Sequence, residues 1–338
     1  MLNSNIQKDF EHTSDTLSMS VAAIAFLSKG FKKPIVEVKF VLIETVPVCL
    51  KVLTMTPGIE SLRNKIIIYL QRMILCLDRE ILYAMPRFLM LLIEHCDSQD
   101  IIDVSQLLYQ ICSKFKEEAI SVIDPVVIPF LQKCQALMLH EEEIEHTDKN
   151  TISAYILPEQ MKIKKMMVSL LQHIVVNGVT PILLSVSNAP AIKNILQLMN
   201  EGASDLAEPV MQRSCIKFFR EIINQWGREA MTSSKVVSVQ KDFMCYVEDF
   251  FLPGMIRMLL TSDFDEKSAM QYRILNELAG VLSALKSHYD GNEFHRKILV
   301  KTFTFMKCPD MLISRFSQAC TSIEMENCLK MMLVTLKY

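Results

Sequence analysis

The chain has 338 residues, of which 50% are hydrophobic and 22% charged, and its formal net charge is −2. A balance so close to zero is not that of a stand-alone nucleic-acid-binding domain, which is usually strongly basic. The 8 glycines, 22 methionines and 8% aromatic residues favour long helices over a β-sandwich, so we expect an all-α chain.

The N-terminal segment and the cysteines indicate a reducing compartment. MLNSNIQKDFEHTSD is polar and acidic, and it lacks the basic and apolar regions of a signal peptide. The 10 cysteines form no CxxC pair and lie mostly in apolar helical stretches. We therefore expect reduced, buried thiols in a cytosolic or nuclear protein.

The spacing of apolar residues along the chain predicts helices that come in pairs. The predicted pairs are 34–55 with 60–76, 79–96 with 100–115, 119–140 with 158–177, 179–200 with 205–226, and 240–261 with 264–287, and a closing set covers 291–337. Polar insertions are predicted at 140–157 and 228–240. The second helices have one broad apolar face, which only a neighbouring pair can bury.

A proline recurs in the first helix of most pairs. The stretch CLDREILYAMPRFLMLLIEHCDSQD reads as one amphipathic helix with Pro86 in its middle, and related motifs surround Pro47, Pro129, Pro181 and Pro253. A proline inside a helix bends it, as the outer helices of a curved stack require. The pattern predicts a HEAT-repeat α-solenoid formed by a single segment, 1–338, with all five prolines on one side. The alternative is a scatter of incidental helix prolines.

Signals for catalysis, metals and membranes are weak. The uncharged stretch 166–192 is long enough to span a bilayer, but the turn between Gly178 and Pro181 splits it, so we expect no membrane insertion. GxGxxG, GxxxxGK[ST] and GxSxG are absent, and HEEEIEH (140–146) lacks the spacing of HExxH. We predict a protein that is not an enzyme and has neither a cofactor nor a metal.

Basic residues gather on the predicted second helices of the pairs. If these helices line the concave face, their positive charges attract a polyanion more strongly than scattered charges do. The alternative, which the sequence leaves open, is ordinary solvated helix faces with acidic partners nearby. The strongest candidates share an i, i+4, i+7 spacing, and the full candidate set for RNA contact is Arg213, Lys217, Arg220, Lys162, Lys164, Lys165, Arg63, Lys65 and Arg72.

Several segments in register resemble one known family. They are YLQRMILCLDREIL, SQLLYQICSKFKEE, DPVVIPFLQ, EPVMQRSCIKFFREIINQWG, DFMCYVEDFFLPGMIRMLL and QYRILNELAGVLSALKSHYDGNEF. In this order and spacing they resemble the C-terminal HEAT repeats of the exportin-T family of nuclear export receptors for tRNA. The resemblance extends from about residue 58 to the end of the chain.

The resemblance implies the C-terminal part of a larger receptor that shuttles between nucleus and cytoplasm. It implies tRNA and Ran-GTP as cooperative partners, with the main Ran-binding arch in an N-terminal region outside the matched segments, and nucleoporins as further possible partners. Side chains cannot read the deep major groove of double-stranded RNA, so a receptor for all tRNAs is expected to contact the backbone. The competing interpretation is a protein-binding HEAT scaffold or a karyopherin for protein cargo, with aromatic and methionine anchors in its groove.

Overall fold

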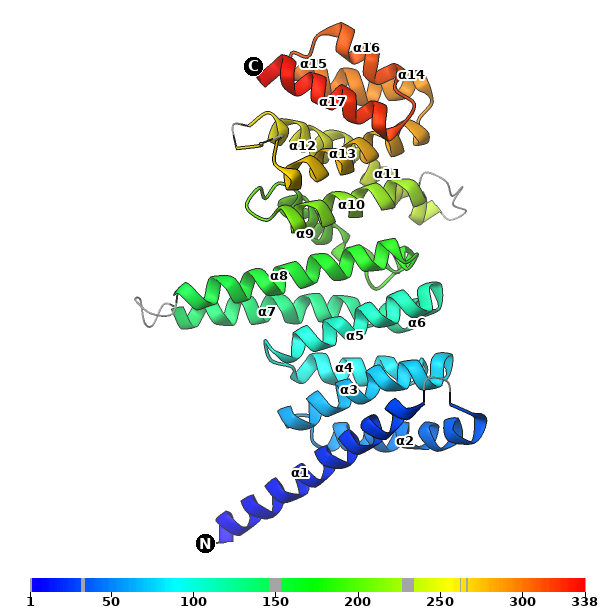
Figure 1. Ribbon diagram of the computed structural model, residues 1–338, viewed down its shortest axis with the longest axis vertical. Helices are drawn as coiled ribbons and strands as arrows, with labels where there is room; N and C mark the ends of the chain where they lie inside the picture. Colours follow the sequence, from blue (N-terminus) through cyan, green and yellow to red (C-terminus); the bar gives the residue numbers. More distant parts are fainter. Residues whose placement is uncertain are drawn as a thin grey trace. The chain divides into compact units, whose positions relative to one another are not determined.

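The computed structural model describes residues 2–31, 34–145, 153–226, 234–261, 263–265 and 267–337 (Figure 1). Within these ranges the chain forms helices and the connections between them, and no strand occurs there. The prediction of an all-α helical-repeat fold is confirmed. The chain divides into two compact units, residues 1–188 and residues 189–338, which are described separately below.

The first unit arranges its long helices in two rows. The row that we call the α3 row contains α1 (Leu2–Leu27), α3 (Glu60–Leu77), α5 (Asp100–Phe115) and α8 (Ser153–Val176). The α4 row contains α2 (Val36–Met55), α4 (Met85–His95) and α7 (Val127–Glu145), preceded by the short α6 (Ile120–Ile123). Across the rows α2 contacts α3, α4 contacts α5 and α7 contacts α8, which confirms the pairing predicted for this part of the chain.

Residues 2–27 form a helix that the sequence analysis did not predict. Its buried positions, Ser14, Ser18, Val21 and Ala25, have helical spacing, and Ser18 Oγ lies 3.3 Å from Ser61 Oγ of α3. These side chains are small, which suits close packing of α1 on α3. The sequence analysis looked for large apolar residues at helical spacing, so it did not detect this helix.

Four of the five recurrent prolines begin a helix rather than bend one. Pro47 lies inside α2, as predicted, but Pro86 is the second residue of α4 and Pro129 the third residue of α7. Pro181 is in the first turn of a 3-10 helix, Thr180–Leu184, and Pro253 is in the first turn of α12 (Leu252–Leu259). The prediction of one continuous helix over 79–96 is thus wrong. Proline is tolerated in the first turn because the amide it lacks would have no partner there.

Helices α3 and α5 of the first unit are related by a shift of 38 residues, which their buried positions share and the prolines do not follow. In the α3 row, Leu62, Ile66, Tyr69, Leu70, Met73, Ile74 and Leu77 are buried, and so are the residues 38 positions later, Asp100, Val104, Leu107, Leu108, Ile111, Cys112 and Phe115. The residues that follow α3 and α5, Asp78 and Lys116, have positive φ angles of 57° and 50°. A 3-10 turn begins at each of them, Asp78–Ile81 and Lys116–Ala119, so the backbone repeats as well as the core.

The second unit has the same two-row construction. Its α10 row contains α10 (Pro209–Trp226), α13 (Ala269–His288) and α17 (Ser322–Lys337), in contact in that order. The other elements are α9 (Ile192–Ala203), α11 (Ser234–Tyr246), α12, α14 (Gly291–Glu293), α15 (Lys301–Phe305) and α16 (Asp310–Gln318), with π-helical turns at Val247–Phe251 and Phe294–Val300. The two helices predicted at 240–261 and 264–287 are present with shifted boundaries, the first as α11, a π-helical turn and α12, and the second as α13.

Both predicted polar insertions are partly helical. Helix α7 continues to Glu145 and α8 begins at Ser153, so helices enter the predicted insertion 140–157 from both sides. Helix α11 begins at Ser234, inside the predicted insertion 228–240. The remaining residues of the two predictions, 146–152 and 228–233, lie outside the described residues.

The thiols are unpaired, as predicted, and eight of the ten are buried, with Cys245 and Cys320 exposed. Burial raises the pKa of the Cys112 thiol to about 12, so this thiol stays protonated at neutral pH. In the part of the chain that the structure describes, no single helix has both the length and the apolar character needed to cross a bilayer. One pair bent by 88°, Asp100–Ile123 with Val127–Leu139, passes the same test of length and composition.

Candidate nucleic-acid interface

The nine candidate basic residues lie on three helices, each in the row to which the second helices of the pairs belong. Helices α3 and α8 carry six of them in the first unit, and α10 carries three in the second. What each side chain can offer a ligand depends on its exposure and on the groups that already bind it. The three helices are therefore considered in turn.

Arg63 is part of the core of the first unit. Its side chain is 5% exposed, and its Nε donates to Asp100 Oδ2 at 2.5 Å. Its Nη1 donates to the carbonyl oxygen of Pro57 at 3.1 Å, and Nη2 lies 3.4 Å from Asp97 Oδ2. Asp100 is itself 1% exposed, so the arginine neutralises a buried carboxylate where α5 begins. Arg63 thus stabilises the fold, and its guanidinium is too buried to donate hydrogen bonds to RNA.

Arg72 also binds within the protein. Its Nη2 donates to the carbonyl oxygen of Ser28 at 2.7 Å, which ties α3 to the end of α1. On α5, the next helix of the row, Lys114 Nζ donates to the carbonyl oxygen of Ile74 and lies 3.0 Å from Asp78 Oδ1. Cations of the α3 row thus bind the carbonyl ends of the preceding helix, where positive charge is favourable. Lys65 is half-exposed on α3 and is the member of the α3 set best placed to meet a ligand.

The three lysines of α8 differ in exposure because they occupy different sides of the helix. Lys162 is exposed, whereas Lys164 and Lys165 are half-exposed, as Lys65 is. The helix is positioned by Tyr109 of α5, whose hydroxyl donates to the carbonyl oxygen of Met166 at 2.9 Å and whose ring stacks on His173 at 4.6 Å. Lys162 is accordingly the lysine of this group that presents its charge most fully to solvent.

On α10, two of the three candidates converge on one buried acid. Arg213 Nε donates to Glu277 Oε1 at 3.0 Å, and Arg220 Nη1 donates to Glu277 Oε2. Glu277 belongs to α13 and its side chain is 7% exposed. Arg220 Nη2 also lies 2.8 Å from Glu221 Oε1, and Arg220 is 25% exposed. Arg213 and Arg220 do lie on one side of α10, as their spacing predicted, but that side is turned toward α13.

The glycine at position 280 makes room for this arrangement. A Cβ atom at Gly280 would lie 2.8 Å from Arg220 Cδ, so a larger residue would displace the arginine stem from α13. Arg213 is still 48% exposed, and Lys217, between the two arginines in sequence, is half-exposed. The accessible positive charge of α10 therefore rests on Arg213 and Lys217.

Arg273 is a basic residue that the sequence analysis missed. It is exposed on α13, one helical turn before Glu277, and α13 packs on α10. Arg273 and Glu277 lie about sixty residues from the α10 candidates in sequence. The sequence alone therefore did not show that they belong beside α10. With Arg213 and Lys217, Arg273 extends the exposed cations of the α10 row.

The exposed cations at these positions can bind anionic groups. Exposed lysine and arginine side chains offer hydrogen-bond donors and positive charge, which suit phosphate groups. Among the described residues there is no group of three or more His, Cys, Asp or Glu side chains placed to hold a metal ion.

The packing of helix pairs in two rows, described above for the first unit, defines an all-α helical-repeat protein of the HEAT type. The family model of Exportin-T matches residues 5–337, which is nearly the whole chain. The chain belongs to the Exportin-T family, and the resemblance seen in the sequence is confirmed.

Individual relatives are similar at low identity. Exportin-T of Oryza sativa subsp. japonica is 24% identical over 313 residues, which are 89% of this chain and 30% of that protein. Exportin-T of Arabidopsis thaliana is 21% identical over 318 residues, 92% of this chain and 31% of that protein. Exportin-T of Mus musculus is 24% identical over 229 residues, 67% of this chain and 22% of that protein. The chain thus spans less than a third of the length of these relatives.

Proposed function

We propose that this chain is the C-terminal HEAT-repeat portion of a karyopherin-type nuclear export receptor for tRNA. The observation that carries the proposal is the match of the Exportin-T family model over residues 5–337. The protein moves between nucleus and cytoplasm, and Ran-GTP binds mainly through a region that this chain does not span. Nucleoporins are transient partners during passage.

The RNA contacts that we propose are narrower than the set expected from sequence. Lys65, Lys162, Arg213 and Lys217 offer exposed or half-exposed charge, and Lys164 and Lys165 stand beside Lys162 on α8. Arg213 also pairs with Glu277 but stays 48% exposed. Arg63, Arg72 and Arg220 are less exposed and already bind carboxylates or carbonyl oxygens of the protein. Binding through phosphates and 2′-hydroxyls needs no base-specific side chains, so a few well-placed cations suffice for recognition of the tRNA backbone.

A second function is favoured by exposed apolar side chains on α3 of the first unit and on α13 of the second. Ile68 and Leu75, seven residues apart on α3, are 43% and 48% exposed, and Met270 and Tyr272 are exposed at the start of α13. Such side chains anchor protein partners rather than RNA backbones. The alternative proposal is accordingly a protein-binding helical-repeat scaffold, or a karyopherin with protein cargo.

The test is a measurement of tRNA affinity against salt concentration. We expect the double variant Lys162→Gln/Lys217→Gln to bind tRNA more weakly than the native chain. The loss of affinity should be the same for several different tRNAs. The slope of log affinity against log salt should fall by about 2, roughly one for each phosphate that the variant no longer neutralises. The control is Lys193→Gln, which removes an exposed lysine from α9, outside the α10 row, and should leave the slope unchanged.

The same titration separates the two proposals. If the double variant retains the native affinity and slope while its circular dichroism is unchanged, these lysines do not contact RNA. A chain that fails to bind tRNA at all, with or without Ran-GTP, favours the protein-binding alternative. Replacement of Ile68 and Leu75 by serine would then test that alternative on cargo proteins.

A further inference from the structure

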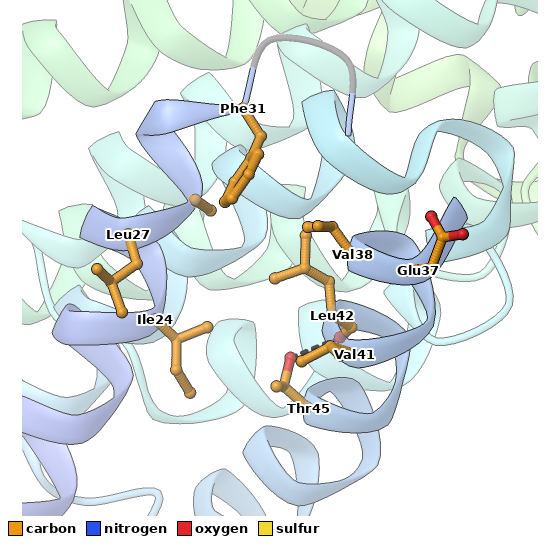
Figure 2. Close-up of a pocket in the computed structure, with 9 residues that line it drawn as sticks. Ile24, Leu27, Phe31, Glu37, Val38, Val41, Leu42 and Thr45 are labelled. Carbon is orange, nitrogen blue, oxygen red and sulfur yellow. Dashed lines mark hydrogen bonds between the residues drawn. The ribbon is translucent and has the colours of Figure 1, made fainter. Parts of the chain in front are cut away.

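The cavity between α1 and α2 is poorly suited to an anionic ligand, although its volume is about 410 Å³ (Figure 2). Figure 2 shows Leu27 of α1 on one side of it and Leu42 of α2 on the other. The hydroxyl groups of Ser28 and Thr45 donate to backbone carbonyl oxygens, and the charged lining residue is an acid, Glu37. A phosphate needs hydrogen-bond donors that are held in place, and such donors occur instead on α10 and α13 of the second unit.

Glu277 of α13 binds two arginines of α10 in different ways. Arg220 has a second acid, because its Nη2 lies 2.8 Å from Glu221 Oε1, and its side chain is 25% exposed. Arg213 bonds to Glu277 through Nε, at 3.0 Å, and its side chain remains 48% exposed. An arginine held at Nε still has the N–H groups of Nη1 and Nη2, whose planar geometry matches two oxygens of a phosphate. Arg213 is therefore the arginine of this pair that can meet a ligand.

The carboxylate of Glu277 is itself fixed in position. It is 7% exposed, and Arg220 Nη1 donates to its Oε2, the oxygen that Arg213 does not use. Arg220 passes close over α13, since a Cβ atom at Gly280 would lie 2.8 Å from Arg220 Cδ. A surface arginine loses rotamer freedom when it binds a ligand. Arg213, held by a fixed carboxylate, has lost part of that freedom before any ligand binds.

A further cation lies beside Arg213. Arg220 contacts α13 at Gly280, and Arg213 contacts it about one turn earlier. The two helices therefore run in the same direction where they meet. Arg273 precedes Glu277 by one turn on the same side of α13, so it lies toward Arg213 rather than toward Arg220. Arg273 is exposed, so its charge also reaches solvent at this place.

Net positive charge and positioned donors come from different residues here. Two glutamates formally balance Arg213 and Arg220, so the net charge comes from Arg273 and from the half-exposed Lys217. We propose that Glu277 is a positioning residue of a phosphate-binding site on α10 and α13. Arg213 is the donor that binds the phosphate, and Arg273 and Lys217 attract it. The inference rests on the proposed function in one respect, namely that the phosphate belongs to RNA.

The test compares two substitutions that remove the same charge. Glu277→Gln leaves an amide whose NH2 group cannot accept a bond from a second arginine. Arg220 keeps its contact with Glu221, so Arg213 is the arginine that is released. We expect tRNA binding to be about tenfold weaker and the salt slope to be lower by about 1. The control Glu221→Gln keeps the contact of Arg213 and should bind tRNA at least as tightly as the native chain, because it removes an acid near the RNA.

Two further variants separate positioning from folding. With Arg213→Gln already present, Glu277→Gln should weaken binding no further, since the donor that it positions is gone. Glu277→Asp keeps the charge but is one methylene shorter, so it cannot reach both arginines, and it should weaken binding at least about threefold. It replaces Glu277→Gln if circular dichroism shows that variant to be unfolded. Native affinity in a folded Glu277→Asp variant would contradict the proposal.

Each variant is titrated by calorimetry with tRNA and with a short inorganic polyphosphate. Glu277-dependent binding of the polyphosphate without binding of tRNA would support the site and contradict the proposed function. If Glu277→Gln binds tRNA as tightly as Glu221→Gln does, the inference is overturned and the proposed function stands. The inference also fails if Glu277→Gln weakens binding equally in the presence of Arg213→Gln, which is the result of a purely structural role. A native chain that binds neither ligand would overturn both.

Discussion

Replacing Arg63 by methionine separates a role in folding from a role in RNA binding. Methionine keeps most of the length of the side chain but removes the donors that bind Asp100 Oδ2 at 2.5 Å and the Pro57 carbonyl at 3.1 Å. Asp100, 1% exposed, is then left as a buried carboxylate with no cation beside it. Removing one partner of a buried ion pair costs about 3 to 5 kcal/mol, and we expect a loss of unfolding free energy in this range at neutral pH.

The loss should shrink as the pH falls. Burial raises the pKa of Asp100, and Arg63 opposes that rise, so the pKa in the variant is higher still. A carboxyl group whose pKa is raised on folding contributes its full stability below its unfolded pKa and loses it as the pH rises through the folded pKa. Asp100 in the variant is therefore neutral, and less costly to bury, near the ordinary aspartate range of about pH 4.

Urea unfolding followed by circular dichroism at neutral pH and at about pH 4.5 measures both effects. The control is Arg79→Met, which removes a cation that is 73% exposed and lies 2.6 Å from Glu118, and it should cost about 0 to 1 kcal/mol. The salt slope of tRNA binding should be the same for Arg63→Met and the native chain. A loss below about 1 kcal/mol, or one that is equal at both pH values, would refute the reasoning.

The positive φ of Lys116, the exposure of the cysteines and the proposed site of Ran binding each give a further prediction. Lys116→Gly should raise the unfolding free energy by about 1 kcal/mol, since glycine tolerates the φ of 50° that strains lysine, and a decrease would contradict this. A thiol reagent should label Cys245 and Cys320 rapidly in the native chain and the eight buried thiols only after unfolding. Ran-GTP should bind the isolated chain with a Kd above about 1 μM by calorimetry, whereas tighter binding would place a Ran site within these residues.

The fold class could be predicted because large apolar side chains mark most helices directly. The repeat itself was assigned from the wrong residues. Pro86 and Pro129 lie 43 positions apart and begin helices, whereas Asp78 and Lys116, which carry the repeated backbone turn, have little in common as side chains. The shift of 38 residues between α3 and α5 is visible in which residues are buried, and burial depends on packing that the sequence does not display.

The candidate site could be predicted less well, because charge pairing is a tertiary property. The spacing of Arg213 and Arg220 correctly placed them on one side of α10. Their partner Glu277 is about sixty residues away in sequence, and its nearness depends on the packing of α13 on α10. Arg63 likewise gave no sequence signal of burial, since its ion pair with Asp100 forms only when α5 packs on α3. The contribution of the remaining lysines to RNA binding stays a prediction.

The similar junctions at Asp78 and Lys116 make the repeat a removable module. Deleting residues 78–115 would join Leu77 to Lys116, and the new junction would keep the positive φ and the 3-10 turn that already follow α3. The buried positions of α3 would take the register that α5 holds beside α8, since the two helices bury equivalent positions. Such a chain can lose or gain one repeat while the connecting turns keep their backbone conformation. This gives the architecture a simple route to different lengths in evolution.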